Sequence, residues 1–442
     1  MGLPAICPSR RRFLTAGAAS AAGLAVPGLA PLTTASCAAA ATVDTNARLV
    51  IVGGGSAGTS LANRLTRATR GARITIVDPS GTHRYQPGDT LVATGVWEPQ
   101  QLLRPQAAFL PDAVTWVREA VAAFDPETNR VVTETGRAIT YDFLIVATGL
   151  IFEFERIEGM EPDLIGREGI GSVYGNAAAT WPVLREFIQT GGVGLFGRPP
   201  GELKCAGAPL KVTFLAIDQA QRAGTRDRLD FIFNAESDRL FSVPVYHDFV
   251  EQRLGELGVT VNRSFVLTGI DPGARTATYR TPAGPVTLGY DFIHVVPPMV
   301  APRPVRDSPL AWQEGRYAED GWLEADPDTL RHPRYPNVFG AGDVLGVPRG
   351  KTAASVKAQV PVVTENLLSV IAGGEPTARF NGYTSCPLIT RIGAALLVEF
   401  DYDGNLTPTL PFVDPTRESW LPWLLKTRFL QPTYYAMLRG HV

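Results

Sequence analysis

Residues 48–58 read Arg-Leu-Val-Ile-Val-Gly-Gly-Gly-Ser-Ala-Gly, and this stretch decides the fold. The apolar run predicts a buried strand, and the pattern Gly-x-Gly-x-x-Gly follows it at Gly53, Gly55 and Gly58. Apolar side chains at helical spacing come next, and a second strand ends at Asp78. A strand, a glycine turn, a helix and an acid in this order form the βαβ fingerprint of a dinucleotide-binding fold.

Each part of this fingerprint has a physical task. Gly53 allows the tight turn, Gly55 lets the backbone approach a pyrophosphate, and Gly58 lets helix and strand pack closely. The helix N-terminus faces the phosphates, and the acid is placed to bind a ribose hydroxyl. The expected cofactor contacts are therefore Gly53, Gly55, Ser56, Ala57, Gly58 and Asp78.

Two later strands indicate which dinucleotide is bound. One ends in Ala147-Thr148-Gly149, and the other ends in Gly342-Asp343. Together with the first fingerprint, they resemble the two-dinucleotide-binding-domain flavoproteins, in which the Gly-Asp aspartate binds the ribityl chain of FAD. The resemblance implies an α/β fold with two Rossmann-like domains, the FAD domain being discontinuous, plus a C-terminal segment that faces a membrane or an interface.

This resemblance also implies domain boundaries. They are an FAD-binding domain at 46–155 and 300–390, a second Rossmann-like domain at 156–299, and a C-terminal strand with an apolar tail at 391–442. Ahead of them, the composition of residues 1–45 predicts a twin-arginine signal peptide.

The second domain departs from the nicotinamide-binding pattern. Its strand at 192–197 runs into Arg-Pro-Pro-Gly at 198–201, and proline has no N–H to offer a pyrophosphate. We therefore expect no use of NADH or NADPH. Cys205 stands just before a helix expected to start near Ala208, and the helix dipole, Lys204 and Lys211 should lower its pKa.

Composition narrows the function classes. The chain has 442 residues, 19% charged and 45% hydrophobic, with a net charge of −2, so a globular protein is expected and nucleic-acid binding is not. The five histidines show no metal-ligand spacing, and no metal is assigned. Of the four cysteines, Cys205 and Cys386 lie beyond the N-terminal segment; counting alone favours one structural disulfide.

The N-terminal segment has the pattern of a targeting signal. Twin arginines occur in residues 9–14, small and apolar residues follow at 16–32, and a run of alanines at 38–41 could be the cleavage site. These features predict twin-arginine export to the periplasm. A membrane-spanning N-terminal helix and lipidation at Cys37 are the alternatives.

The cysteine contexts make the resemblance specific. Residues 204–211, Lys-Cys-Ala-Gly-Ala-Pro-Leu-Lys, and residues 382–388, Gly-Tyr-Thr-Ser-Cys-Pro-Leu, look like the two cysteine motifs of sulfide:quinone oxidoreductases, in the subgroup that includes the mitochondrial enzyme. The similarity also includes residues 85–87, 295–299, 335–340, 351–354 and 399–402.

The resemblance implies a reaction. Sulfide attacks a sulfur-bridged Cys205–Cys386 unit, Cys386 is left as a persulfide, and a small-molecule sulfur acceptor removes it. Cys205 forms the adduct or charge-transfer complex with the flavin, which passes two electrons to quinone. The remaining expected FAD contacts are Gln86, Val121, Ala147, Thr148, Gly149, Gly342, Asp343, Lys351 and Thr352. No cysteine occurs near Tyr85, so the FAD should be non-covalent.

The tail at 420–438 is rich in aromatic and apolar residues, with basic residues between them. It is too short and too interrupted by proline to span a bilayer, so we expect an interfacial anchor that leads quinone to the flavin. Docking on the body of the protein or burial in a homo-oligomer are alternatives of nearly equal weight.

Three other functions remain open at this point. The nearest is the flavin subunit of a periplasmic flavocytochrome c-type sulfide dehydrogenase. An NADH:quinone reductase is disfavoured by the prolines at 199 and 200. A flavin-bearing interaction protein without enzymatic activity is the third.

Overall fold

The first parallel sheet contains the glycine fingerprint. In the computed structural model, which describes residues 42–442, its strands lie in the order β22-β11-β2-β4-β7 and all its pairings are parallel. Their bounds are β2 Arg48–Val52, β4 Arg73–Val77, β7 Thr115–Val117, β11 Phe143–Val146 and β22 Val338–Gly340. Helix α1 (Ser56–Ala68) connects β2 to β4, which confirms the predicted βαβ unit.

The glycine turn between β2 and α1 depends on the absence of side chains. Gly53 has φ +104°, and a Cβ there would lie 2.3 Å from the Ala147 carbonyl oxygen. A Cβ on Gly58 would lie 1.9 Å from the Gly53 carbonyl oxygen. Any larger residue would therefore push α1 away from the sheet.

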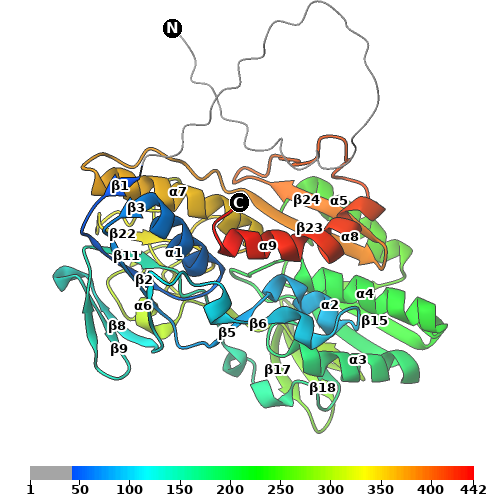
Figure 1. Cartoon of the computed structure of the whole chain (residues 1–442). Helices are drawn as coiled ribbons and strands as arrows, with labels where there is room; N and C mark the ends of the chain where they lie inside the picture. Colours follow the sequence, from blue (N-terminus) through cyan, green and yellow to red (C-terminus); the bar gives the residue numbers. More distant parts are fainter. Residues whose placement is uncertain (1–41) are drawn as a thin grey trace, which may run out of the picture. The chain divides into compact units, whose positions relative to one another are not determined.

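The second parallel sheet has the order β13-β20-β14-β15-β16. Its strands are β13 Ile170–Gly171, β14 Gly192–Gly197, β15 Leu229–Ala235, β16 Thr260–Arg263 and β20 Phe292–His294. Three helices pack against its strands: α3 (Ala177–Thr190), α4 (Ala208–Ala223) and α5 (Pro244–Glu256) (Figure 1). Two parallel sheets with helices confirm the predicted α/β fold class.

Smaller antiparallel sheets and strand pairs complete the fold. Two have three strands each: β8 Val121–Asp125, β9 Arg130–Thr133 and β10 Ala138–Thr140; and β17 Val266–Asp271, β18 Thr276–Thr281 and β19 Gly284–Gly289. The pairs are β5 Thr82–Arg84 with β6 Leu103–Pro105, β12 Ile151–Phe152 with β21 Met299–Val300, and β23 Thr384–Arg391 with β24 Ala394–Phe400. The two-residue strands β1 Val43–Asp44 and β3 Thr69–Arg70 pair in parallel.

The remaining helices are α2 Asp89–Ala93, α6 Arg303–Arg306, α7 Ala353–Ile371, α8 Trp420–Leu424 and α9 Leu430–Leu438, with a π-helix at Leu425–Phe429 between the last two. Single 3-10 turns occur at Gln86–Gly88, Pro99–Leu102, Gln106–Ala108, Pro126–Thr128, Phe154–Arg156, Pro162–Leu164 and Arg226–Arg228.

One strand was not predicted from the sequence. Cys386 lies inside β23, paired with Val398 of β24, and β24 is the predicted C-terminal strand. Pro387, next to Cys386, is atypical of a strand interior, since proline cannot donate to a ladder. A two-stranded sheet has an open edge on each strand, so a missing N–H is tolerated.

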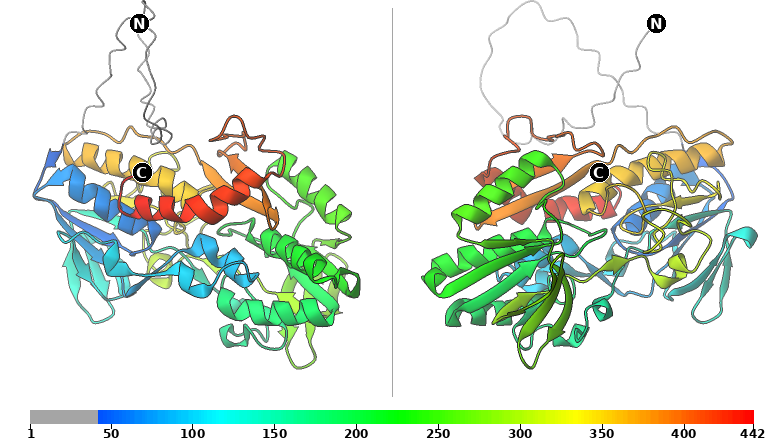
Figure 2. Two further views of the ribbon diagram at one scale, coloured as in Figure 1. Left: turned by 45° about the vertical axis from the view of Figure 1, so that its right-hand side comes forward. Right: turned by 180° about the vertical axis from the view of Figure 1, so that it is seen from behind.

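The C-terminal helices pack back on the body. Helix α9 lies along α1, and β23 and β24 lie beside α4 and α8 (Figure 2). Arg67 of α1 donates to the carbonyl oxygens of Arg439 and Gly440, at 2.8 and 2.6 Å. Within residues 42–442, none of the helices has the length and apolar character needed to cross a membrane.

Candidate functional site

The two predicted cysteines meet in the structure. Cys205 lies in the loop before α4, Cys386 lies in β23, and their Sγ atoms are 3.6 Å apart, both as free thiols. They come together because α4 packs against β23. Cys386 is buried and Cys205 is half-buried, so the pair lies just below the protein surface.

Lys211 points at both sulfur atoms. It lies near the beginning of α4, and its Nζ is 3.2 Å from Cys205 Sγ and 3.1 Å from Cys386 Sγ. Burial alone would lower the pKa of its ammonium group, but the adjacent sulfur atoms, Cys205 ahead of Cys386, raise it above the ordinary value. Lys211 therefore stays charged and provides a fixed positive charge beside the pair.

The two thiols have opposite pKa shifts. A hydrogen bond from Cys386 holds the pKa of Cys205 well below its ordinary value, and Lys211 adds to this against the effect of burial. The same hydrogen bond, with burial, raises the pKa of Cys386. Cys205 is therefore the thiolate of the pair, and a thiolate is the form that reacts with sulfur.

The backbone at Cys205 is strained. Its φ is +47°, a left-handed conformation that a residue with a side chain seldom adopts. Its N–H donates to the Lys351 carbonyl at 2.9 Å, and its carbonyl accepts from Ala208 N–H at 2.7 Å. The hydroxyl of the half-buried Tyr174 lies 3.3 Å from the same carbonyl. These contacts hold the loop in place and maintain the strain.

Lys204, next to Cys205 in sequence, extends toward an expected cofactor residue. Its Nζ donates to Gln86 Oε1 at 2.6 Å and lies 4.7 Å from the centre of the Phe152 ring. Burial lowers the pKa of this ammonium group. The structure thus brings Gln86, an expected cofactor residue, to the cysteine loop.

The glycine fingerprint forms a turn held by its acid. The Asp78 carboxylate accepts from Gly54 N–H at 2.5 Å and from Ser80 N–H at 2.7 Å. Each carboxylate oxygen keeps lone-pair capacity for a ribose hydroxyl. Ser56 and Ala57 form the first turn of α1, and no side chain caps this helix end.

Several features around the turn fit a dinucleotide. A Cβ built on Gly55 or on Gly149 would meet no atom within 4 Å, so space remains beside both residues. The Thr148 hydroxyl is buried and has no hydrogen-bond partner among the described residues. The N–H groups of the uncapped α1 end are suited to a phosphate. Open space, an unpaired hydroxyl and free N–H groups together fit the FAD expected here.

The Gly-Asp strand leads to a buried charged cluster. Burial raises the pKa of Asp343, while the nearby Lys204 and Lys351 oppose this. Lys351 Nζ donates to the Asp343 and Leu345 carbonyls, at 2.8 and 2.6 Å, and lies 3.6 Å from the centre of the Trp322 ring. Burial lowers the pKa of Lys351 to about 8.

The other expected cofactor residues have different surroundings. Gly342 N–H donates to Gln359 Oε1 at 2.8 Å, and Thr352 caps α7 by accepting from Ser355 N–H at 3.1 Å. Ala147 follows β11 directly, and its N–H donates to the Val52 carbonyl at 2.8 Å. Val121 begins β8 and pairs with Thr133, so it lies on a separate sheet from the glycine turn.

Lys426 is a site residue whose role the sequence did not indicate. It comes from the π-helix of the tail, is buried, and donates from Nζ to the Pro87 carbonyl at 2.5 Å. Its charge contributes to the low pKa of Cys205. Burial and the charge of Lys211 lower its own pKa to about 8. The only signal was a basic residue among the aromatic and apolar residues of the tail.

A buried hydrogen-bond chain joins the tail to the glycine turn. Gln106 Nε2 donates to the Gly54 carbonyl at 3.0 Å, so Gln106 Oε1 faces His83 Nδ1, at 3.0 Å. His83 Nε2 lies 2.8 Å from the Tyr434 hydroxyl. Burial lowers the pKa of His83, so the ring is neutral: Nδ1–H donates to Gln106 and Nε2 accepts from Tyr434.

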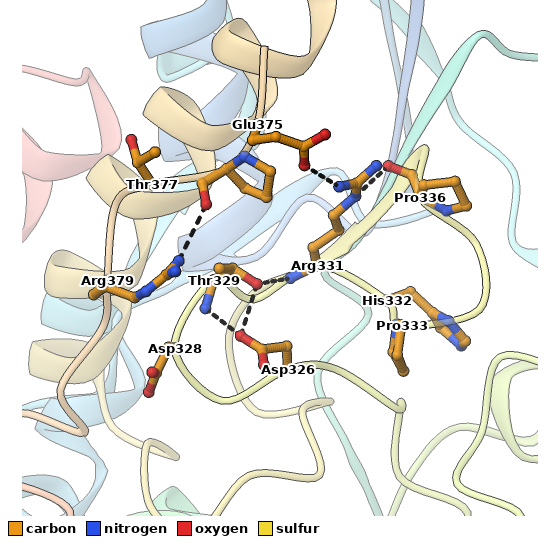
Figure 3. A pocket seen from close by; sticks show the side chains of 11 residues that line it. Asp326, Asp328, Thr329, Arg331, His332, Pro333, Pro336, Glu375, Thr377 and Arg379 are labelled. Carbon is orange, nitrogen blue, oxygen red and sulfur yellow. Dashed lines mark hydrogen bonds and ion pairs between the residues drawn. The ribbon is translucent and has the colours of Figure 1, made fainter.

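A surface cavity of about 600 Å³ lies elsewhere, beside β22 and the end of α7 (Figure 3). Several of its side chains are paired with one another: Arg331 approaches Glu375 at 3.7 Å, and Thr329 Oγ1 donates to Asp326 at 2.8 Å. None of the predicted site residues lines it. It is therefore separate from the cysteine site.

Comparison with known proteins agrees with this geometry. Residues 47–175 match the family described as pyridine nucleotide-disulphide oxidoreductase. A Dictyostelium discoideum protein named mitochondrial sulfide:quinone oxidoreductase is 36% identical over 398 residues, which cover 89% of this chain and 86% of that protein. The mitochondrial sulfide:quinone oxidoreductase of Mus musculus is 34% identical over 409 residues, 91% of this chain and 89% of that protein.

The predicted periplasmic location was wrong. These relatives are mitochondrial proteins, and nothing in the comparison supports twin-arginine export. The prediction depended on residues 1–45, nearly all of which lie outside the described part of the chain. It failed because a basic, acid-poor N-terminus is shared by several kinds of targeting segment, so its composition does not distinguish them.

Among solved structures, the sulfide:quinone oxidoreductase of Aquifex aeolicus superposes with a TM-score of 0.75 at 20% identity, covering 89% of this chain and 92% of that one. At this identity the likeness concerns the fold. The identity to the curated relatives, over nearly the whole length of each, decides the family. The chain belongs to the sulfide:quinone oxidoreductases.

Proposed function

We propose that the protein oxidises sulfide at the Cys205–Cys386 pair and passes the electrons through FAD to a quinone. One observation carries the proposal: two free thiols lie 3.6 Å apart, with the Lys211 ammonium within hydrogen-bond distance of both. The family named above has this activity in its name. The flavocytochrome alternative is not favoured, since the relatives are named for quinone.

The spacing of the sulfur atoms suits one bridging sulfur. Two S–S bonds of about 2.05 Å at a bent central sulfur separate the outer atoms by roughly 3.3 Å. The 3.6 Å between the Sγ atoms is close to this value. A direct disulfide would require the two Sγ atoms to approach to about 2.05 Å, a movement several times larger than the one needed to accept a bridging sulfur.

Each bond formed in the sulfur step is matched by one that breaks. Hydrosulfide attacks Sγ of Cys386 in the bridged pair. The new S–S bond makes Cys386 a persulfide, and the bond between Cys386 Sγ and the bridging sulfur breaks. The electron pair of the broken bond leaves with the bridging sulfur, which stays on Cys205 as a persulfide anion beside the Lys211 ammonium.

A thiol or sulfite of low molecular weight then removes the outer sulfur of the persulfide. When bound, FAD accepts the two electrons released at Cys205 and delivers them to quinone. The protein's part is to hold Cys205 ionised and fixed, which Lys211, Lys426 and the strained loop support.

The glycine turn, Thr148, Gly149 and Asp343 would hold the FAD. The space at Gly55 and Gly149 and the unpaired Thr148 hydroxyl support this assignment. We propose non-covalent binding, since the sequence has no cysteine near Tyr85. Residues 46–155 with 300–390, and 156–299, remain the proposed domains.

The tail is the proposed contact with the membrane surface. Trp420 is 61% exposed and Phe429 is 54% exposed, whereas Lys426, between them in sequence, reaches into the site. This arrangement supports a quinone path along the tail from the lipid surface. Assembly into a homo-oligomer stays a prediction.

The test is an anaerobic titration of the purified, flavin-loaded protein. Sulfide should bleach the flavin absorbance, and decylubiquinone should restore it with one quinone consumed per flavin. Lack of bleaching by sulfide would contradict the proposal. Bleaching without reoxidation by quinone, together with co-purification of a haem protein, would favour the flavocytochrome instead.

A further inference from the structure

A second cavity, of about 200 Å³, lies at the carboxyl ends of strands in the second sheet. Its walls include Phe196 of β14, Asn234 of β15 and His294 of β20, together with Pro199 and Pro200. The carboxyl edge of a parallel sheet is where doubly wound folds bind ligands. Cys205 and the glycine turn do not line this cavity, so it is distinct from the proposed sulfide and FAD sites.

His294 contributes a buried donor without a partner. Its Nε2 accepts from Val173 N–H at 3.2 Å, and its Nδ1 has no hydrogen-bond partner among the described residues. Burial lowers the pKa of the ring to about 3, so the ring is neutral and Nδ1 carries its proton. Nδ1–H is therefore a buried donor, on a residue that lines the cavity, for which the described residues supply no acceptor.

Asn234 contributes a second donor. Its Oδ1 accepts from Asn262 Nδ2 at 2.9 Å, while its own Nδ2 is buried and makes no hydrogen bond within residues 42–442. Burial raises the pKa of the nearby Tyr279, and an interaction with the Asn234 side chain partly offsets this. Two side chains that line one cavity and carry buried donors without a hydrogen bond of good geometry are unusual in a folded protein.

The charged groups around the cavity are all basic. Arg156, Arg198 and Arg280 line it, and no acid does. Arg156 is paired with Glu153 at 2.5 Å and Arg198 with Glu236 at 2.6 Å. Arg280 is exposed, and its guanidinium makes no ion pair or side-chain hydrogen bond in the described part of the chain. The Arg280 guanidinium at the rim therefore adds a positive charge to a cavity whose walls include the unpaired donors of His294 and Asn234.

We propose that this cavity binds a small organic anion with a flat apolar body. Its oxyanion accepts from His294 Nδ1 and Asn234 Nδ2 and pairs with Arg280, while its body packs on Phe196 and Pro199. Because Pro199 and Pro200 have no N–H groups, a pyrophosphate is not the ligand. The loop that continues from these prolines carries Cys205, so a bound ligand would restrain it.

The probe is benzoate, with neutral benzamide of the same shape as its control. Calorimetric titration into the full-length, flavin-loaded protein should give a dissociation constant below about 1 mM for benzoate. Benzamide should bind about tenfold more weakly. Arg280→Ala, at the exposed rim, should weaken benzoate about tenfold, and His294→Phe should do so with a native circular dichroism spectrum. Arg185→Ala, on the exposed face of α3, is the matched control and should bind like the wild type.

Absence of saturable benzoate binding overturns the inference, as does equal binding of benzamide or binding unchanged in Arg280→Ala. A benzoate-induced change in the flavin spectrum that persists in Arg280→Ala also overturns it, because it places the probe at the flavin. Sulfide bleaching is measured on the same samples. Loss of bleaching with intact benzoate binding would contradict only the proposed function.

Discussion

The His83 imidazole and the Tyr434 hydroxyl are joined by a hydrogen bond of 2.8 Å, although 351 positions separate them in the sequence. Through Gln106 this bond continues to the Gly54 carbonyl. The last helix is thus connected to the turn at which a dinucleotide phosphate would bind. The C-terminal tail therefore supports the glycine turn from inside the protein.

Replacing Tyr434 by phenylalanine should weaken this support. The change leaves His83 Nε2 buried without a donor, which should cost about 1–3 kcal/mol of unfolding free energy. FAD should also dissociate more readily, measured by flavin fluorescence on dilution. Tyr435→Phe is the matched control: among the described residues, the Tyr435 hydroxyl makes one hydrogen bond, which it accepts from Gln431 Nε2 at 3.3 Å. Equal behaviour of the two variants would contradict the proposed support.

Replacing Cys205 by serine should abolish flavin bleaching by sulfide while FAD stays bound. Serine is nearly the same size, but its hydroxyl is hardly ionised near neutral pH and holds no bridging sulfur. Cys386→Ser should block turnover because sulfide loses the sulfur it attacks. Bleaching is measured at a temperature where the circular dichroism spectrum is native. Normal bleaching in folded Cys205→Ser would refute the mechanism, and a loss of only about 2–5 kcal/mol of stability with activity retained would indicate a structural disulfide.

Removing the charge of Lys211 should change the pH dependence of thiol reactivity. The pKa of Cys205 lies below its ordinary value, so its thiolate persists as pH falls below about 8.5 and disappears only at lower pH. In Lys211→Met the pKa of Cys205 should rise, and the loss of alkylation by iodoacetamide should begin at higher pH. Lys211→Arg keeps the charge and should resemble the wild type. Superimposable pH profiles for wild type and Lys211→Met would show that Lys211 does not stabilise the thiolate.

NADH and NADPH should reduce the flavin at least about a thousandfold more slowly than sulfide. The turn after β14 contains Pro199 and Pro200, which have no N–H to offer a pyrophosphate. Stopped-flow absorbance compares the reductants under anaerobic conditions. Reduction by NADH at the rate seen with sulfide would show that the second domain binds nucleotide after all.

Phe429→Asp should weaken sedimentation with phosphatidylcholine vesicles. Burying an aromatic side chain in a lipid interface contributes about 1.5–3 kcal/mol, so the partition coefficient should fall at least about tenfold. Ile151→Asp is the control, since Ile151 is also an exposed apolar residue but lies in β12, outside the tail. If the control loses as much binding as Phe429→Asp, the tail is not the membrane contact.

The sequence was most informative where a local pattern determines local structure. The glycine fingerprint predicted β2, α1 and β4 correctly because steric exclusion at Gly53 and Gly58 acts over a few residues. The start of α4 at Ala208 also agreed, with proline in its first turn. Contacts between segments far apart in the sequence were harder to predict. Nothing in the spacing of Lys426 or Tyr434 indicated that they would reach Pro87 and His83, because tertiary packing alone decides those contacts.

The late position of β22 has a consequence for how the chain acquires its structure during synthesis. The Asn337 side chain donates to the Asp142 carbonyl across 195 positions, and β22 pairs with β11 just beyond it. Until the ribosome has made residues 338–340, β11 presents an open edge, and Asp343 is still missing from the proposed FAD site. The residues of the second sheet, 170–294, emerge earlier and can pair first. If FAD binds as proposed, its loading would wait until about three-quarters of the chain has been translated.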